Sequence, residues 1–107
     1  MLENTKFFEI LNYMESYFQI REKVKVDSNY HDKIIENIKN NLIKKYSEVD
    51  IRDGIKVIKD ENTWILIRKS NTEDIIRISG ESNDKEKCKI IINNMIKMVK
   101  ENYEKVK

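Results

Sequence analysis

The sequence is poor in the residues that mark several classes of protein. It has no proline and only two glycines among 107 residues, so few of its turns depend on the special backbone geometry of these residues. Its one cysteine, Cys88, cannot form an intramolecular disulfide or a cysteine-rich zinc site. We therefore expect a reducing compartment and a cytoplasmic protein.

Long apolar runs and blocks of one charge are also missing. The longest apolar run has only a few residues, which predicts no membrane span, and the start of the chain lacks a signal-peptide core. The 21 basic and 19 acidic residues are interspersed, whereas proteins that bind duplex DNA typically carry a basic stripe. We expect neither a membrane nor a nucleic acid as the partner.

The spacing of apolar residues predicts the order of the elements. A 3.6-residue period indicates helices over residues about 5–18, after Asp27-Ser28, and from the predicted capping pair Asn83 and Glu86 onwards. A period of two indicates strands at 19–26, 55–57, 63–68 and 75–79. This order favours an α+β domain with an antiparallel sheet of about four strands, two helices on one face and an extra N-terminal helix. Residues 64–67 are apolar on both faces, which predicts an inner strand.

Several reactive or metal-binding residue types have a structural interpretation that we favour. His31, the only histidine, lies in the first turn of a helix without a partner cluster, so we predict a solvated side chain. Cys88 and Met95 fall on an apolar helix stripe, which predicts burial, with Met98 at its edge. The acidic residues Glu48, Asp50 and Asp53 fit a turn, although oxygen ligation of a metal remains an alternative.

The stretch RKSNTED, residues 68–74, places several donors in a short connection between two strands. Arg68 offers a fork of N–H groups for phosphate oxygens, and Ser70 and Thr72 each add a hydroxyl. Asn71 adds an amide, and Arg77 follows in the next strand. These groups suit a dianion, but Ser-Asn-Thr is also ordinary turn chemistry. The residues alone leave both interpretations open.

A wider pattern around this loop resembles a known family. RKSNTED followed by IIRISGES is similar to the phosphate-binding loop of the α-D-phosphohexomutases, R-x-S-N/G-T-E-P with an arginine in the next strand. The stretch DGIKV at 53–57, the Trp64 strand and the last helix also match. The resemblance covers most of residues 18–103 and implies the TATA-binding-protein-like C-terminal domain at 19–107, with residues 1–18 as the end of the preceding domain.

The resemblance implies roles for individual loop residues. Arg68, Ser70, Asn71 and Thr72 would hold the non-reacting phosphate of a hexose phosphate, supported by residues Arg77, Glu73 and Lys69. Asn71 favours the phosphomannomutase/phosphoglucomutase branch. Asp74 replaces the usual proline, which predicts a looser loop and an unfavourable charge near the phosphate.

The chain lacks the parts that such enzymes use for phosphoryl transfer. No serine loop, metal loop or sugar loop of the family's kind occurs in it, so we predict no catalytic residue and no cofactor here. The resemblance implies Mg²⁺ on another domain, and the remaining mutase domains and a hexose phosphate as partners. We expect an isolated chain to be inactive. Two alternatives are a stand-alone ligand-sensing or protein-interaction module and a nucleic-acid binder with a helix-backed sheet.

Overall fold

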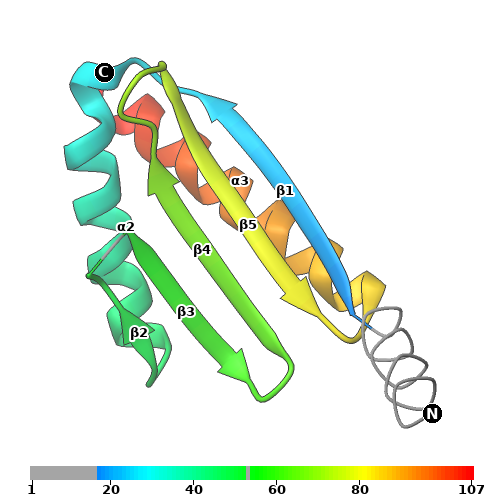
Figure 1. Ribbon diagram of the computed structural model, residues 1–107. Helices are drawn as coiled ribbons and strands as arrows, with labels where there is room; N and C mark the ends of the chain where they lie inside the picture. Colours follow the sequence, from blue (N-terminus) through cyan, green and yellow to red (C-terminus); the bar gives the residue numbers. More distant parts are fainter. Residues whose placement is uncertain (1–16, 53) are drawn as a thin grey trace, which may run out of the picture.

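The computed structural model describes residues 17–52 and 54–107. Most of the predicted N-terminal helix, at 5–18, lies outside these residues, and its expected last residue, Phe18, instead begins a strand. Figure 1 shows the elements in chain order. They are β1 (Phe18–Lys25), the 3₁₀ turn η1 (Ser28–Tyr30), α2 (His31–Lys45), β2 (Val49–Asp50), β3 (Ile55–Asp60), β4 (Thr63–Lys69), β5 (Ile75–Ser82) and α3 (Lys85–Val106).

The strands form one antiparallel sheet in the order β1-β5-β4-β3-β2. The predicted α+β class is confirmed, and β4 is an inner strand as expected. The described residues hold five strands rather than about four. The additional strand, β2, has two residues that pair with Val57 and Lys56 of β3, and a segment this short cannot show the alternation by which strands are found in a sequence.

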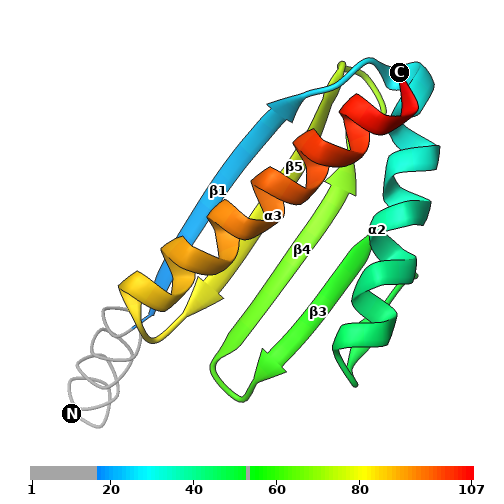
Figure 2. The same cartoon turned by 180° about the vertical axis from the view of Figure 1, so that it is seen from behind.

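The described helices, α2 and α3, lie on the same face of the sheet, behind it in Figure 1 and before it in Figure 2. Their apolar stripes, which include Ile34, Ile38, Ile92 and Val99, are buried against the inward residues of the strands. Removing this apolar area from water is the main force that holds the two layers together. No helix of the described residues is both long and apolar enough to cross a bilayer.

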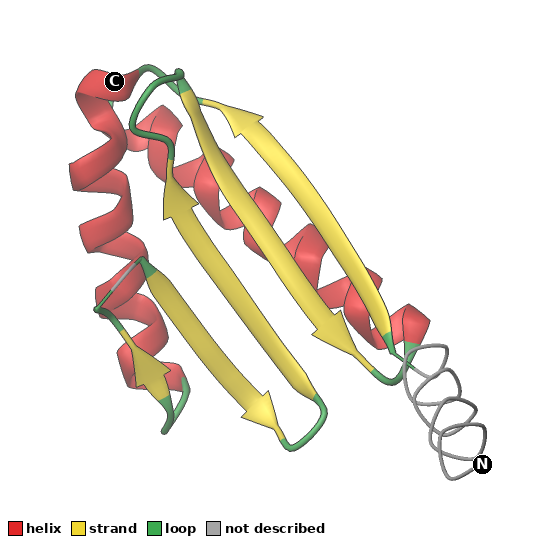
Figure 3. Cartoon of the chain, in the orientation of Figure 1, coloured by secondary structure: helices red, strands yellow, loops and turns green. Residues whose placement is uncertain are grey.

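The other face of the sheet, which we call the open face, is covered by no helix of the described residues (Figure 3). Side chains alternate along β4, so Ile65 and Ile67 are buried under the helices while Trp64 and Leu66 are half-exposed on the open face. This separation explains why β4 is apolar on both sides. One set of side chains builds the core, and the other lies on an accessible surface.

Local hydrogen bonds fix where the helices begin. The Asp27 carboxylate accepts the Asn29 amide at 2.9 Å and caps η1, which leads directly into α2. At α3 the cap is Asp84, which accepts the amides of Glu86 and Lys87. The predicted cap at Asn83 was therefore one residue too early, because β5 continues to Ser82 and the chain turns only after it.

Candidate functional site

The predicted phosphate loop closes a hairpin between two inner strands. β4 ends at Lys69 and β5 begins at Ile75, and the Ser70 amide donates to the Ile75 carbonyl at 3.1 Å. Both strands are paired on both sides, so the ends of the loop are held by the rigid centre of the sheet. A binding loop placed in this way loses little conformational freedom when a ligand arrives.

Ser70 organises the loop from inside. Its hydroxyl oxygen accepts the backbone amides of Thr72 at 3.3 Å and Glu73 at 3.1 Å, a local turn that serine side chains commonly form. These bonds use the lone pairs of the oxygen and leave the hydroxyl hydrogen to donate outward. Ser70 can therefore shape the loop and contact an anion at the same time.

Asp74 anchors the far side of the loop to the end of β1. Its carboxylate accepts the Ser28 amide at 3.0 Å, and its carbonyl accepts the Val26 amide at 2.9 Å. The hydrogen bonds from Ser28, its backbone amide first, lower the pKa of Asp74. We expected a looser loop because Asp74 stands where the resembling motif has proline. That expectation did not include this anchor, in which two hydrogen bonds to the segment after β1 restrain Asp74.

Arg68 lies at the base of the loop on the open face, next to Gly54. Gly54 has a φ of 86°, and a Cβ placed on it would lie 2.5 Å from the Ile67 carbonyl and 2.7 Å from Cγ of Arg68. Only glycine accepts both this backbone conformation and this close approach. The turn before β3 can therefore pack tightly against the stem of Arg68.

The loop faces a hollow of about 390 Å³ between β4 and α2. Arg68, Lys69 and Asn71 line it together with Gly54, so the structure brings three of the predicted residues to one cavity. The helix contributes negative charge to the same hollow. Its remaining lining residues, among those that the structure describes, are Asp32, Ile35 and Glu36.

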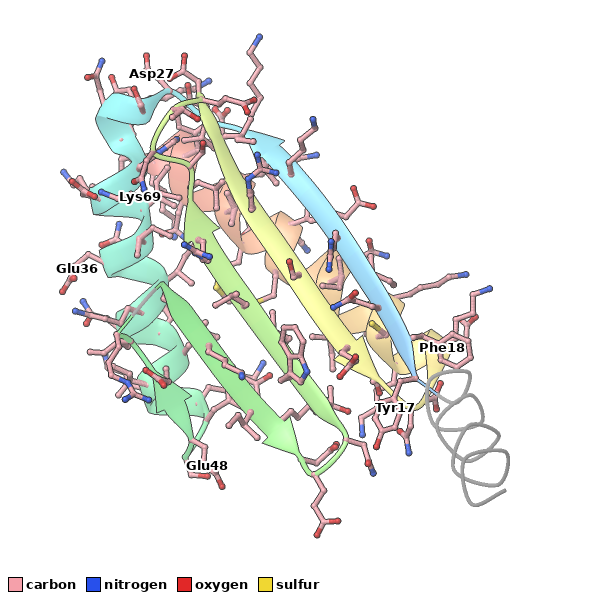
Figure 4. All side chains as sticks on the ribbon, in the orientation of Figure 1. Tyr17, Phe18, Asp27, Glu36, Glu48 and Lys69 are labelled. Atoms are coloured by element: carbon pink, nitrogen blue, oxygen red, sulfur yellow. The ribbon has the colours of Figure 1, made fainter. Side chains whose placement is uncertain are left out.

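Two ion pairs position the supporting residues. Lys69 reaches across to α2, where its ammonium lies 2.6 Å from the Asp32 carboxylate and lowers the pKa of that group; Figure 4 shows Lys69 on the α2 side of the loop. The Arg77 guanidinium lies 3.6 Å from the Glu73 carboxylate. Glu73 thus joins the loop to β5, while Arg77 points into a different hollow, on the open face.

Asp32 is a residue that the sequence did not single out. It belongs to α2, 37 positions before its partner Lys69, and nothing in the local pattern joins them. Ser70, Thr72 and Glu73 do not line the hollow, and Thr72 and Glu73 are exposed. The predicted set is therefore split: one part faces the cavity, and the other part forms the outer side of the loop.

With this geometry in hand, the comparisons with known proteins identify the family. Residues 22–98 match the family model described as "Phosphoglucomutase/phosphomannomutase, C-terminal domain". The chain belongs to this family. The resemblance on which the sequence interpretation rests is thereby confirmed.

Curated relatives share this domain over nearly the whole chain. A "Probable phosphoglucosamine mutase" of Methanobrevibacter smithii is 34% identical over 91% of this chain and 22% of its own length. A "Phosphoglucomutase/phosphomannomutase" of Thermococcus kodakarensis is 33% identical over 90% of this chain and 21% of its length. A "Phosphoglucosamine mutase" of Methanocaldococcus jannaschii is 33% identical over 92% and 22%. The chain spans about a fifth of these relatives.

These relatives bear the names of both branches of the family. The assignment of this domain to the phosphomannomutase/phosphoglucomutase branch, which depends on Asn71, therefore stays a prediction. The predicted roles of Arg68, Ser70, Asn71 and Thr72 also stay predictions, since a shared domain does not by itself report a contact with phosphate.

The remaining candidate residues of the domain have structural roles. His31 is 2% exposed, and its Nε2 lies 2.8 Å from the Val26 carbonyl; the prediction of a solvated side chain was wrong because η1 folds the start of α2 back over the end of β1. Cys88 is buried as predicted, and burial raises the pKa of its thiol. Met95 is buried, and Met98 packs at the core edge, both as predicted.

The acidic turn before β3 does not form a metal cluster among the described residues. Asp50 is engaged by the Arg52 guanidinium at 2.8 Å, which with the Arg52 amide lowers the pKa of Asp50 to about 2. Asp53 lies outside the described residues. Within them, no group of three or more histidine, cysteine, aspartate or glutamate side chains is placed to hold a metal ion.

Proposed function

We propose that this domain holds the non-reacting phosphate of a hexose phosphate in a phosphohexomutase, through the loop Arg68–Thr72. The observation that supports this most is the convergence of Arg68, Lys69 and Asn71 on one hollow, at the end of a hairpin whose turn is fixed by Ser70. A guanidinium and an amide on a rigid frame match the oxygens of a phosphate dianion.

The two described acids that line the hollow are each paired with a lysine, Asp32 with Lys69 and Glu36 with Lys39 at 2.8 Å. Asp32 and Glu36 of α2 also line the cavity, and a carboxylate near a dianion is unfavourable. The ammonium of Lys69 lies against Asp32 and offsets that charge. In this proposal, Lys69 contributes by neutralising the wall of the site, while Arg68 contacts the phosphate.

The domain would orient the substrate and leave the chemistry to the rest of the enzyme. Binding a remote phosphate correctly positions the reacting group of the sugar and lowers the entropy cost of the transfer step. In the proposed enzyme the phosphoryl donor and the Mg²⁺ belong to the other domains. The isolated chain would then bind hexose phosphates without converting them.

The first test is a titration of the isotope-labelled chain monitored by NMR. Glucose 6-phosphate, mannose 6-phosphate and glucosamine 6-phosphate are added separately, with inorganic phosphate as the reference anion. We expect amide shifts centred on 68–72, and we expect Arg68→Ala to weaken binding about tenfold or more, because a hydrogen bond to a charged group contributes roughly 1.5–3 kcal/mol.

Three further variants make this titration decisive. Lys33→Ala removes one positive charge from an exposed position of α2 that does not line the hollow, and should leave the affinity nearly unchanged. Ser70→Ala should weaken binding and Ser70→Thr should retain it. Shifts confined to α3, or equal losses in Arg68→Ala and Lys33→Ala, would contradict the proposal.

The second test uses a full-length phosphohexomutase that carries this domain. Arg68→Ala should lower kcat/KM by about tenfold or more, since the binding energy of the remote phosphate serves the transition state as well as the ground state. Circular dichroism checks that the variant is folded. Unchanged kinetics together with binding by the isolated chain would favour the stand-alone ligand-sensing module instead.

A further inference from the structure

On the open face, the pairing of the strands places positively charged side chains next to one another. Lys23 of β1 stands directly opposite Arg77 of β5, and Arg77 stands directly opposite Arg68 of β4. Directly opposed side chains lie about 5 Å apart, and like charges in such pairs are destabilising. Arg21, in the next row of β1, adds another cation opposite Ser79.

Three of these cations line a second hollow, distinct from the phosphate loop. Arg21, Lys23 and Arg77, which we call the cation cluster, share with Ser79 a hollow of about 540 Å³ on the open face. None of its lining residues belongs to the loop hollow. Its other end is formed by Trp64 and Leu66, which are half-exposed.

The cluster is only partly neutralised within the described part of the chain. Arg77 has Glu73 at 3.6 Å, and Arg21 donates to the amide oxygen of Gln19 at 3.2 Å. Lys23 and Arg21 form no ion pair with a described residue. Glu22 also lines the hollow, so its charged lining is three cations against one carboxylate.

The apolar end of the hollow has a fixed geometry. The indole N–H of Trp64 donates to the Glu81 carboxylate at 3.0 Å, and the Lys56 ammonium lies 5.3 Å from the centre of the ring. Trp64 is therefore held in place on the sheet. A rigid aromatic side chain next to a cluster of cations suits a ligand with both an anionic and a ring-bearing part.

We propose that this hollow is a second anion site, for an organic diphosphate. Its phosphate chain would lie along the cation cluster with Ser79 as a hydroxyl donor, and its organic body would cover Leu66 and Trp64. Of two linked phosphates, one could lie against the opposed pair Lys23 and Arg77 and the other against Arg21, opposite Ser79. The volume fits the range of small-molecule sites, about 300–1,000 Å³. The proposal does not depend on the function proposed for the loop.

A strand of nucleic acid fits the same face less well. Sequence-tolerant binding of single strands requires several aromatic platforms along a continuous basic groove, and Trp64 is the only tryptophan of the chain. Glu81, paired to Trp64, and Glu22 place negative charge on this surface. The charge pattern is short and bounded, as expected for a compact ligand.

The test uses ADP, AMP and inorganic diphosphate with the isotope-labelled 107-residue chain. NMR shifts from ADP and diphosphate should centre on 21–23 and 77–79, and ADP should bind about tenfold more tightly than AMP because it places a second phosphate on the cluster. Since Trp64 is the single tryptophan, its fluorescence reports the organic body directly. ADP should change this fluorescence, and inorganic diphosphate should leave it nearly unaltered.

Matched variants distinguish binding at this hollow from a non-specific effect of the chain's positive charge. The double variant Arg21→Gln/Lys23→Gln should lower the affinity for ADP about tenfold or more. The control Lys44→Gln/Lys100→Gln removes the same charge from exposed positions of α2 and α3 and should retain the affinity. Ser70→Ala, which affects only the loop, should also retain ADP binding while it weakens binding of hexose phosphate.

Three outcomes would overturn the inference. The first is ADP shifts confined to 70–74, which would assign all anion binding to the loop. The second is an equal loss of affinity in the two double variants, which would show a non-specific charge effect. The third is tighter binding of a thymidine oligonucleotide than of ADP, with a steep dependence on salt, which would indicate a nucleic-acid surface.

Discussion

The covered and the open face of the sheet are made by the same strands but carry different chemistry. Toward the helices, β4 and β5 present Ile65, Ile67, Ile76 and Ile78, all almost fully buried. Toward the open face, the same strands present Arg68 and Arg77, which are opposite each other. Alternate residues of the same strands therefore form two different surfaces. Residues of one surface can be substituted without changing the other.

This comparison explains where the domain can bind ligands without losing stability. The covered face supplies the apolar burial on which a chain of this size depends. The open face and the loop beside it contribute little burial, so cations can gather there at a small cost. Both anion sites that we propose lie on this side or at its edge, and neither uses a residue of the core.

The largest expected effect comes from removing a side chain of the covered face. Ile67→Ala should lower the free energy of unfolding by about 2–5 kcal/mol, since a fully buried isoleucine is replaced and a cavity remains. Leu66→Ala, at the neighbouring position on the open face, should lower the free energy of unfolding by about 1 kcal/mol or less. Urea denaturation of the two variants measures the contrast, and an equal loss would mean that the open face is also covered.

Gly54→Ala should have the next largest effect. It forces a non-glycine residue into a φ of 86° and places a Cβ 2.5 Å from a backbone carbonyl, so we expect a loss of about 1–3 kcal/mol. In Gly80→Ala the new Cβ meets Cδ1 of Ile92 at 2.7 Å, the movable end of a side chain. Urea denaturation should therefore show a smaller loss for Gly80→Ala, and the reverse order would contradict the strain argument.

Ser70→Ala tests whether the serine shapes the loop from within. It removes the acceptor of the Thr72 and Glu73 amides, which should cost about 1 kcal/mol and speed hydrogen exchange at those two amides. Ser70→Thr keeps a hydroxyl and should preserve their protection. Unchanged exchange in Ser70→Ala would show that the loop is held by Asp74 and the strand ends alone.

The fold could be predicted from the sequence because its elements are long and strongly periodic. α2 and α3 carry apolar patterns that only a helix satisfies, and the buried residues on their stripes were found in this way. β2 was missed because two residues define no period. His31 was misplaced because its burial depends on η1 and on the Val26 carbonyl, neither of which the helix pattern contains.

The residues of the candidate site were named from the sequence, but their arrangement was not. Arg68, Lys69 and Asn71 were recognised by resemblance, and the structure places them on one hollow. Asp32 and Ser28 were not found, because their contacts to the loop join positions 37 and 46 residues apart. Alternation does predict which residues of β1 share a face, but pairing β1 with β5 requires the three-dimensional register.

The smallest expected effect is an acid-dependent one at the opposite end of the sheet. Asp60 of β3 bonds the Lys87 ammonium of α3 at 2.5 Å, and with the Asn62 amide this lowers the pKa of Asp60 from 3.8 to about 2. A lowered pKa in the folded state means that the stabilisation is complete above about pH 4 and is lost as the pH falls toward 2. The pair joins the sheet to the helix layer at an exposed edge, so its contribution is small.

Asp60→Asn and Lys87→Met should therefore differ from the parent chain above pH 4 and converge with it toward pH 2. Urea denaturation at a series of pH values measures this, and the double variant should lose little more than either single variant, since both remove one interaction. If the free energy of unfolding differed from that of the parent chain by the same amount at all pH values, the loss would be assigned to the Asn62 turn instead of the ion pair. Because this bridge touches neither hollow, binding of hexose phosphate and of ADP should survive both substitutions. The edge that joins the two layers can then be weakened while both proposed sites remain intact.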